Sequence, residues 1–117
     1  PLPLPNVAPH LTERIRNEHP GQRIKTSMDR SLQLQLNTLA ERHYQLLKSN
    51  EIHNLAILVL DVENRKVLGY VGNSPSGKTH GSYVDIISKN RSTGSTLKPF
   101  LFASLSVSVV TAWFALR

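Results

Sequence analysis

Residues 91–100 of this 117-residue chain, Arg-Ser-Thr-Gly-Ser-Thr-Leu-Lys-Pro-Phe, decide the expected fold and chemistry. Ser95 and Lys98 lie three residues apart at the expected start of a helix that runs to about Leu105. Residues at this spacing share a helix face, with Cβ atoms about 5–6 Å apart, so the Lys98 amine can reach the Ser95 hydroxyl. Gly94 permits a sharp turn into the helix, and the helix N-terminus disfavours a protonated Lys98 and favours a nearby oxyanion. The stretch therefore predicts Ser95 as a nucleophile and Lys98 as its general base.

Pro99 affects the start of this helix. It has no N–H to bond to the Ser95 carbonyl, so we expect a tight, 3₁₀-like first turn that holds the serine at a surface. Four apolar side chains of the helix are expected to be buried: Leu97, Phe100, Leu101 and Leu105.

The S-x-x-K pattern alone is weak, but its surroundings are more specific. The stretch 82–100, SYVDIISKNRSTGSTLKPF, closely resembles the segment around the active-site serine of class A penicillin-binding proteins, especially the type 1C branch. The stretch 26–33, TSMDRSLQ, resembles the start of the transpeptidase region in the same family. The resemblance extends over about residues 5–105.

The resemblance implies an α+β fold: the N-terminal part of a transpeptidase domain of the penicillin-binding-protein and serine β-lactamase type. Its elements would be an amphipathic helix, an antiparallel hairpin and an active-site helix. Residues 1–23 would form a Pro-containing linker, and residues 24–105 the first part of the transpeptidase domain. Residues 106–117 form an apolar tail that departs from the family, which suggests a truncated or frame-shifted product.

The implied activity is D,D-transpeptidation in peptidoglycan cross-linking. Ser95 would attack a D-Ala-D-Ala peptide to give an acyl-enzyme, Lys98 would take and return the proton, and backbone N–H groups, including that of Ser95, would hold the oxyanion. The parent family also has glycosyltransferase activity, and its partners are the peptidoglycan stem peptide, lipid-linked glycan and β-lactam antibiotics. The implied location is the periplasmic face of the bacterial inner membrane, reached through an N-terminal anchor that this sequence does not contain.

Two of the family's three catalytic elements, S-x-N and K-T-G, are not found after Lys98. We therefore expect this chain by itself to be an incomplete, inactive fragment. The alternative is a non-catalytic interaction or pedestal fragment. No cofactor is implied.

The rest of the sequence predicts two helices and a strand upstream of residue 50. A short helix is expected near His10–Glu18, ended by Pro20-Gly21, and a short strand over 24–28. Asp29 is expected to cap a helix of about 29–48. The predicted apolar stripe of this helix comprises Leu32, Leu36, Leu39, Ala40, His43, Leu46 and Leu47, with His43 as a partnered histidine at the core edge. Arg30, Gln33, Asn37, Glu41 and Lys48 are predicted to lie largely off the stripe.

Residues 54–61 and 66–72 are apolar runs joined by the polar turn 62–65, a pattern that predicts an antiparallel hairpin. The first run is apolar enough to be buried on both faces. Residues 72–81 are rich in Gly, Ser and Pro and are expected to form a loop.

Residues 72–79, GNSPSGKT, satisfy the P-loop pattern and leave nucleotide binding as a lesser alternative. A P-loop needs a helix that begins at the Lys-Thr step, whereas residues 80–84 are expected to be loop turning into strand.

Other classes of function have less support. The net charge of +6 is scattered and lacks interleaved aromatic residues, so no nucleic-acid partner is predicted. The five histidines show no ligand spacing and the chain has no cysteine, so no metal site is predicted.

Overall fold

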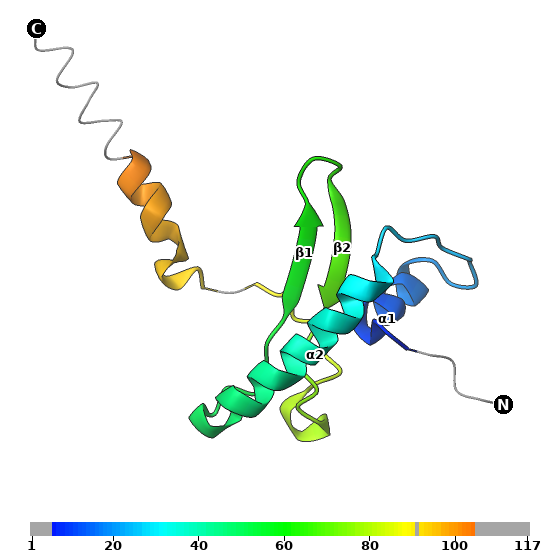
Figure 1. Cartoon of the computed structure of the whole chain (residues 1–117), viewed down its shortest axis with the longest axis horizontal. Helices are drawn as coiled ribbons and strands as arrows, with labels where there is room; N and C mark the ends of the chain where they lie inside the picture. Colours follow the sequence, from blue (N-terminus) through cyan, green and yellow to red (C-terminus); the bar gives the residue numbers. More distant parts are fainter. Residues whose placement is uncertain (1–5, 91, 105–117) are drawn as a thin grey trace, which may run out of the picture.

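The computed structural model describes residues 6–90 and 92–104 (Figure 1). Its helices and strands are α1 (Pro9–Glu18), α2 (Arg30–Leu47), β1 (Ile57–Asp61) and β2 (Lys66–Val71), with short 3₁₀ turns η1 (Lys48–Asn50), η2 (Lys78–His80) and η3 (Gly94–Leu97). The combination of helices with a small antiparallel sheet is consistent with the predicted α+β class.

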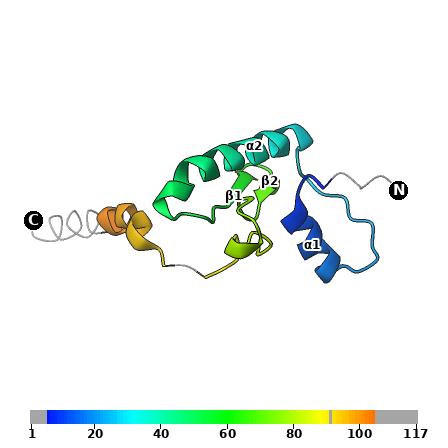
Figure 2. The same ribbon diagram turned by 90° about the horizontal axis from the view of Figure 1, so that it is seen from below.

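Helix α2 lies across one face of the β1–β2 hairpin, and α1 lies beside β2 (Figures 1 and 2). Both helices follow the sequence predictions closely. The Asp29 carboxylate accepts a hydrogen bond of 2.8 Å from the Leu32 N–H, which confirms Asp29 as the N-cap. Helix α1 ends at Glu18, just before Pro20-Gly21.

The predicted hairpin is confirmed. Strands β1 and β2 pair antiparallel from Ile57–Val71 to Asp61–Lys66, with an irregularity between Val59 and Leu60. The Asp61 carboxylate accepts hydrogen bonds from the backbone N–H groups of Glu63 and Asn64, both at 3.1 Å. It also accepts one from the Asn64 side chain at 2.7 Å, so the turn is closed by the last residue of β1.

The core lies between α2 and the inner face of the hairpin. Leu36, Ala40 and Val71 are buried there, and the partly buried residues packed against them are Leu32, Leu55, Ile57 and Val59. The outer face of β1 is open: Leu58 is 42% exposed and Leu60 57%. The prediction that this strand is buried on both faces is therefore wrong, because one helix covers only one side of a two-stranded sheet.

The predicted stripe of α2 is partly wrong. The buried residues are Gln33, Leu36 and Ala40, at positions i, i+3 and i+7, whereas Leu39 is 40% exposed and Leu46 64%. His43, predicted at the core edge, is exposed. The two-stranded hairpin covers only one side of the predicted stripe, together with the neighbouring Gln33. The other side of the stripe stays exposed.

The segment 22–29 has no regular secondary structure, so the predicted strand 24–28 is wrong. It nevertheless touches β2: the Asp29 N–H donates to the Leu68 carbonyl at 3.0 Å, and the Ser27 hydroxyl donates to the Val67 carbonyl at 2.8 Å. These two bonds anchor the segment without forming a ladder.

Residues 72–81 form the expected loop, interrupted by η2, but the strand expected beyond residue 81 is not formed. Residues 82–90 make turns instead, held by the Asn73 side chain, which donates to the carbonyls of Gly81 and Val84 at 3.2 and 3.1 Å. Within the described residues, no helix has the length and apolar character needed to cross a membrane.

Candidate functional site

The predicted nucleophile lies in an exposed 3₁₀ turn. Gly94 has a φ of 51° and begins η3, and residues 98–104 continue as helix. The tight first turn expected from Pro99 is confirmed, and Ser95 is exposed within it. The Lys98 N–H donates to the Ser95 carbonyl, so the two residues sit one turn apart.

Lys98 is also exposed, and the hydrogen bonds described for residues 92–104 include none between its amine and the Ser95 hydroxyl. The predicted pair is therefore adjacent on one turn but not joined. A proton transfer between them requires the Lys98 side chain to swing toward Ser95, a rotamer change open to an exposed lysine.

The apolar side chains of this helix are not buried as expected. Leu97 is 46% exposed, Phe100 72% and Leu101 59%. Leu105, the fourth predicted core residue, lies outside the described residues, as do residues 106–117. Figures 1 and 2 show the ribbon of residues 92–104 standing apart from α1, α2 and the hairpin.

The P-loop pattern adopts a different structure. Its Lys-Thr step begins η2, a turn of three residues, rather than an α-helix. A three-residue turn does not present the successive backbone N–H groups that cradle phosphates. We therefore do not propose a nucleotide site there.

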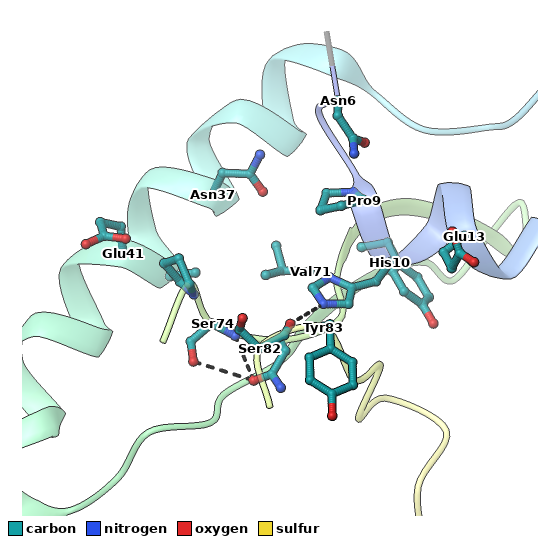
Figure 3. A pocket seen from close by; sticks show the side chains of 14 residues that line it. Asn6, Pro9, His10, Glu13, Asn37, Glu41, Val71, Ser74, Ser82 and Tyr83 are labelled. Carbon is teal, nitrogen blue, oxygen red and sulfur yellow. Dashed lines mark hydrogen bonds between the residues drawn. The ribbon is translucent and has the colours of Figure 1, made fainter. Parts of the chain in front are cut away.

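A groove with a volume of about 820 Å³ lies between α1, α2 and the end of β2 (Figure 3). His10 and Glu13 line it from α1, Asn37 and Glu41 from α2, and Ser82 and Tyr83 from the opposite side (Figure 3). Neither Ser95 nor Lys98 lines it. The sequence analysis did not predict this groove, because its walls come from four separate segments.

Most polar groups deep in the groove are already paired. The His10 Nε2 atom lies 2.7 Å from the Ser82 carbonyl, and the Asn37 amide donates to the Val7 carbonyl at 2.8 Å. The Ser74 hydroxyl donates to the His53 carbonyl at 2.5 Å. These bonds join α1, α2 and the loops, so the groove residues serve first to hold the elements together.

A polar cluster centred on Tyr70, which also lines the groove, connects α1, β2 and the 82–90 turns. The Tyr70 hydroxyl donates to the Asp85 carboxylate at 2.5 Å and accepts from the Arg14 guanidinium at 3.4 Å. Burial, reinforced by the hydrogen bond to Asp85, raises the pKa of Tyr70. The hydrogen bond to Tyr70 is the main cause that raises the pKa of Arg14 above its ordinary value.

The histidines do not form a metal centre in the part of the chain that the structure describes, where no group of three possible ligands gathers. His53 and His80 stack with ring centroids 3.7 Å apart, and the Nε2 atom of His53 lies 3.2 Å from a Glu51 carboxylate oxygen. Stacked rings present their faces to each other, whereas a metal bound by both histidines would need a nitrogen at the edge of each ring to point at it.

Comparison with known proteins gives one informative similarity. Over 103 residues, which are 87% of this chain, the sequence is 30% identical to penicillin-binding protein 1C of Escherichia coli (strain K12). The match spans 13% of the length of that protein. No family model matches the chain. No solved structure matches it significantly. The similarity supports a relationship to penicillin-binding proteins.

Proposed function

We propose that this chain is the segment of a type 1C-like penicillin-binding protein that carries the active-site serine. Ser95 would be the nucleophile and Lys98 the general base. The observation that carries the proposal is the exposed 3₁₀ turn at the start of a helix, where Ser95 and Lys98 lie three residues apart. The similarity to penicillin-binding protein 1C supports the family.

In the proposed reaction the Ser95 hydroxyl attacks the carbonyl carbon of a D-Ala-D-Ala peptide while the Lys98 amine removes the hydroxyl proton. The charge on the carbonyl oxygen is stabilised by backbone N–H groups, including that of Ser95, which have no partner within the first turn of a helix. Lys98 then returns the proton to the leaving D-Ala. An acceptor amine resolves the acyl-enzyme, and a β-lactam would acylate the same hydroxyl.

The remaining partners and the location follow from the family and are part of the proposal. They are the peptidoglycan stem peptide, lipid-linked glycan and the periplasmic face of the inner membrane. The chain by itself is proposed to be inactive, because the sequence carries no S-x-N or K-T-G element after Lys98.

The test is covalent labelling with a fluorescent penicillin. The target is a chimera in which the matched segment of penicillin-binding protein 1C is replaced by the matching residues of this chain. We expect labelling that Ser95→Ala abolishes and that Lys98→Ala slows by roughly 100-fold or more. Ser92→Ala, which changes another exposed serine of the same stretch, should leave labelling unchanged.

Labelling that survives Ser95→Ala, or a folded chimera that is never labelled, would contradict the proposed nucleophile. The purified chain forms the second arm of the experiment and should stay unlabelled. If the purified chain is labelled in a Ser95-dependent way, it contains a working site and the proposed inactivity is wrong.

The second candidate is a non-catalytic interaction or pedestal fragment. It is favoured by the separation between the Ser95 segment and the helix–hairpin unit, which has its own core and hydrogen-bond network. Under this alternative, neither the chimera nor the chain reacts with penicillin.

A further inference from the structure

Helix α1 contributes little to the core. None of its residues is buried, and none belongs to the core cluster between α2 and the hairpin. Its ten residues are fewer than the roughly 12–15 below which an isolated helix is only marginally stable in water. Both its position and its helical form therefore depend on its contacts with the rest of the chain.

Side-chain hydrogen bonds supply these contacts. The His10 Nε2 atom lies 2.7 Å from the Ser82 carbonyl oxygen, and the Arg14 guanidinium donates to the Tyr70 hydroxyl at 3.4 Å. The second distance is long for an N–H···O bond, and the Arg14 side chain is 45% exposed, so water competes for this contact. Two polar contacts of this kind hold a helix less firmly than a buried apolar face does.

Helix α1 also packs loosely against the turns beside it. A hollow of about 390 Å³ lies between α1 and residues 83–89. Charged side chains line much of this hollow: Glu13, Arg14 and Glu18 from the helix, and Asp85 and Lys89 from the turns. Charged groups in contact with water attract each other only weakly, so this side of α1 adds little to its attachment.

The turns on the other side of the groove have anchors of their own. The Asn73 side chain donates to the carbonyls of Gly81 and Val84. The Ile86 N–H donates to the Gly72 carbonyl at 3.0 Å. None of these bonds involves α1, so this wall of the groove can stay in place when α1 moves.

The chain on either side of α1 permits such a movement. Residues 19–26 contain no helix or strand and can extend to about 26 Å at about 3.3 Å per residue. Helix α1 can therefore move without disturbing Ser27 and Asp29, which are bonded to β2. On the N-terminal side, the Val7 carbonyl accepts a hydrogen bond of 2.8 Å from the Asn37 side chain, which holds the chain before the helix against α2.

We propose that α1 is a lid on the groove of Figure 3, hinged at Val7 and closed by the contacts of His10 and Arg14. In the closed form, which the structure shows, His10 and Glu13 form one wall of the groove. In the open form α1 leaves this wall, while α2, the hairpin and the 82–86 turns keep their places. Ligand sites commonly measure about 300–1,000 Å³, so the lid controls access to a groove of that size. This inference does not depend on Ser95 or on the proposed chemistry.

Native-state hydrogen exchange of the full chain, followed by NMR, measures the opening residue by residue. We expect the amides of α1 to exchange through a local opening, with at least about tenfold less protection than the slowest amides of α2. They should still be protected relative to an unfolded chain, because the closed form is the one that the contacts of His10 and Arg14 stabilise.

Substitutions that remove one closing contact should favour the open form. Arg14→Ala should lower the protection of α1 at least about threefold, because the contact with Tyr70 is lost. Arg16→Ala is the matched control, since Arg16 forms its ion pair with Glu13 of the same helix, and it should change the protection less than about twofold. In both variants the amides of α2 and of Ile86 should keep their protection.

His10 tests the second closing contact. His10→Ala should lower the protection of α1, whereas His10→Gln, whose side chain can still donate to the Ser82 carbonyl, should restore most of it. A purely helical effect of the substitution would not be reversed by glutamine at this position.

Gly72→Ala blocks the closed position without removing a polar group. A Cβ atom at position 72 would lie 2.5 Å from the His10 Cβ atom, closer than two such atoms can approach. We expect α1 to lose at least about tenfold in protection while the amides of α2 keep theirs. Unchanged protection of α1 would mean that it does not close on this position, and the proposal would be wrong.

Two further results would overturn the lid. If α1 exchanges only with global unfolding, at the same rate as the slowest amides of α2, it belongs to the same cooperative unit and does not open separately. If Arg14→Ala lowers the protection of Ile86 as much as that of α1, the helix and the opposite wall open together. Equal effects of Arg14→Ala and Arg16→Ala would show that the Tyr70 contact does not close the lid.

Discussion

The side-chain amide of Gln33 pairs with both backbone groups of Tyr70, as a neighbouring strand would. Gln33 is 1% exposed and lies on α2, whereas Tyr70 is on β2, 37 positions along the chain. The same amide also donates to the side-chain oxygen of Asn37 (Oδ1) at 3.0 Å, and the Asn37 side-chain amide donates to the Val7 carbonyl. One buried glutamine thus connects the helix, the hairpin and the segment that precedes α1.

The first prediction concerns this amide. Gln33→Leu keeps the volume of the side chain but leaves the Tyr70 N–H and carbonyl unpaired in a buried position. Each buried unsatisfied group costs about 1–3 kcal/mol, so the two together should lower the free energy of unfolding by about 2–6 kcal/mol. The measurement is urea denaturation followed by circular dichroism.

Gln35→Leu is the matched control, because Gln35 is exposed on the same helix. It should change the free energy of unfolding by no more than about 0.5 kcal/mol. Equal effects of the two substitutions would mean that the Gln33–Tyr70 bonds contribute no net stability.

Gln33 also shows where sequence reasoning fails. A pattern of apolar and polar residues assigns glutamine to the solvent side of a helix, since the pattern carries no information about a buried partner. Gln33, Leu36 and Ala40 have the spacing of one helix face, so the sequence does contain a signal for the buried face. The leucines at neighbouring positions form a more apolar stripe, which favours a different face. Asp29 and the Pro99 turn were predicted correctly because capping and the missing proline N–H act within a few residues of each other.

The errors in burial have a different cause. Leu58, Leu60 and the apolar residues after Ser95 were predicted to be buried because of their apolar character, and the sequence does not show how many strands are present to cover them. Burial depends on contacts between distant segments, and a two-stranded sheet with one helix has only one covered face. The groove was missed for the same reason.

The second prediction is an alkaline loss of stability that depends on Tyr70. Its pKa is raised in the folded state, mainly by burial, so the folded chain holds this proton more tightly than the unfolded chain does. Stability from this group is therefore fully present below about pH 10, where an unfolded tyrosine ionises, and declines as the pH rises from there through the raised folded pKa.

Urea midpoints at about pH 8 and about pH 11 measure the effect. Tyr70→Phe should lower the midpoint at about pH 8, because Asp85 loses its hydroxyl donor, and should reduce the further drop at the higher pH. Tyr83→Phe, at a position 76% exposed, should behave like the unmodified chain. An undiminished alkaline drop in Tyr70→Phe would assign the titration to another group.

The third prediction concerns the hairpin turn. Hydrogen bonds from Asn64, chiefly that of its side chain, hold the pKa of Asp61 below its ordinary value. The stability contributed by the ionised carboxylate is therefore present above about pH 4 and is lost as the pH falls through the lowered folded pKa.

Thermal unfolding followed by circular dichroism at neutral pH and at about pH 2.5 tests this prediction. Asp61→Ala should lower the midpoint at neutral pH and show a smaller loss on acidification than the unmodified chain. Glu63→Ala is the control, because Glu63 joins the turn only through its backbone N–H. A similar acid response in Asp61→Ala and the unmodified chain would contradict the assignment.

The fourth prediction concerns the contact between Gly69 of β2 and Leu36 of α2. A Cβ atom on Gly69 would lie 2.2 Å from the Leu36 Cδ1 atom. Gly69→Ala should therefore destabilise the chain by about 1–3 kcal/mol through overpacking. Leu36→Val removes the Cδ1 atom, so Gly69→Ala should cost at least about 1 kcal/mol less in that background. The four unfolding free energies of this double-mutant cycle give the coupling directly. If the two costs simply add, steric contact with Leu36 is not why glycine is required at position 69.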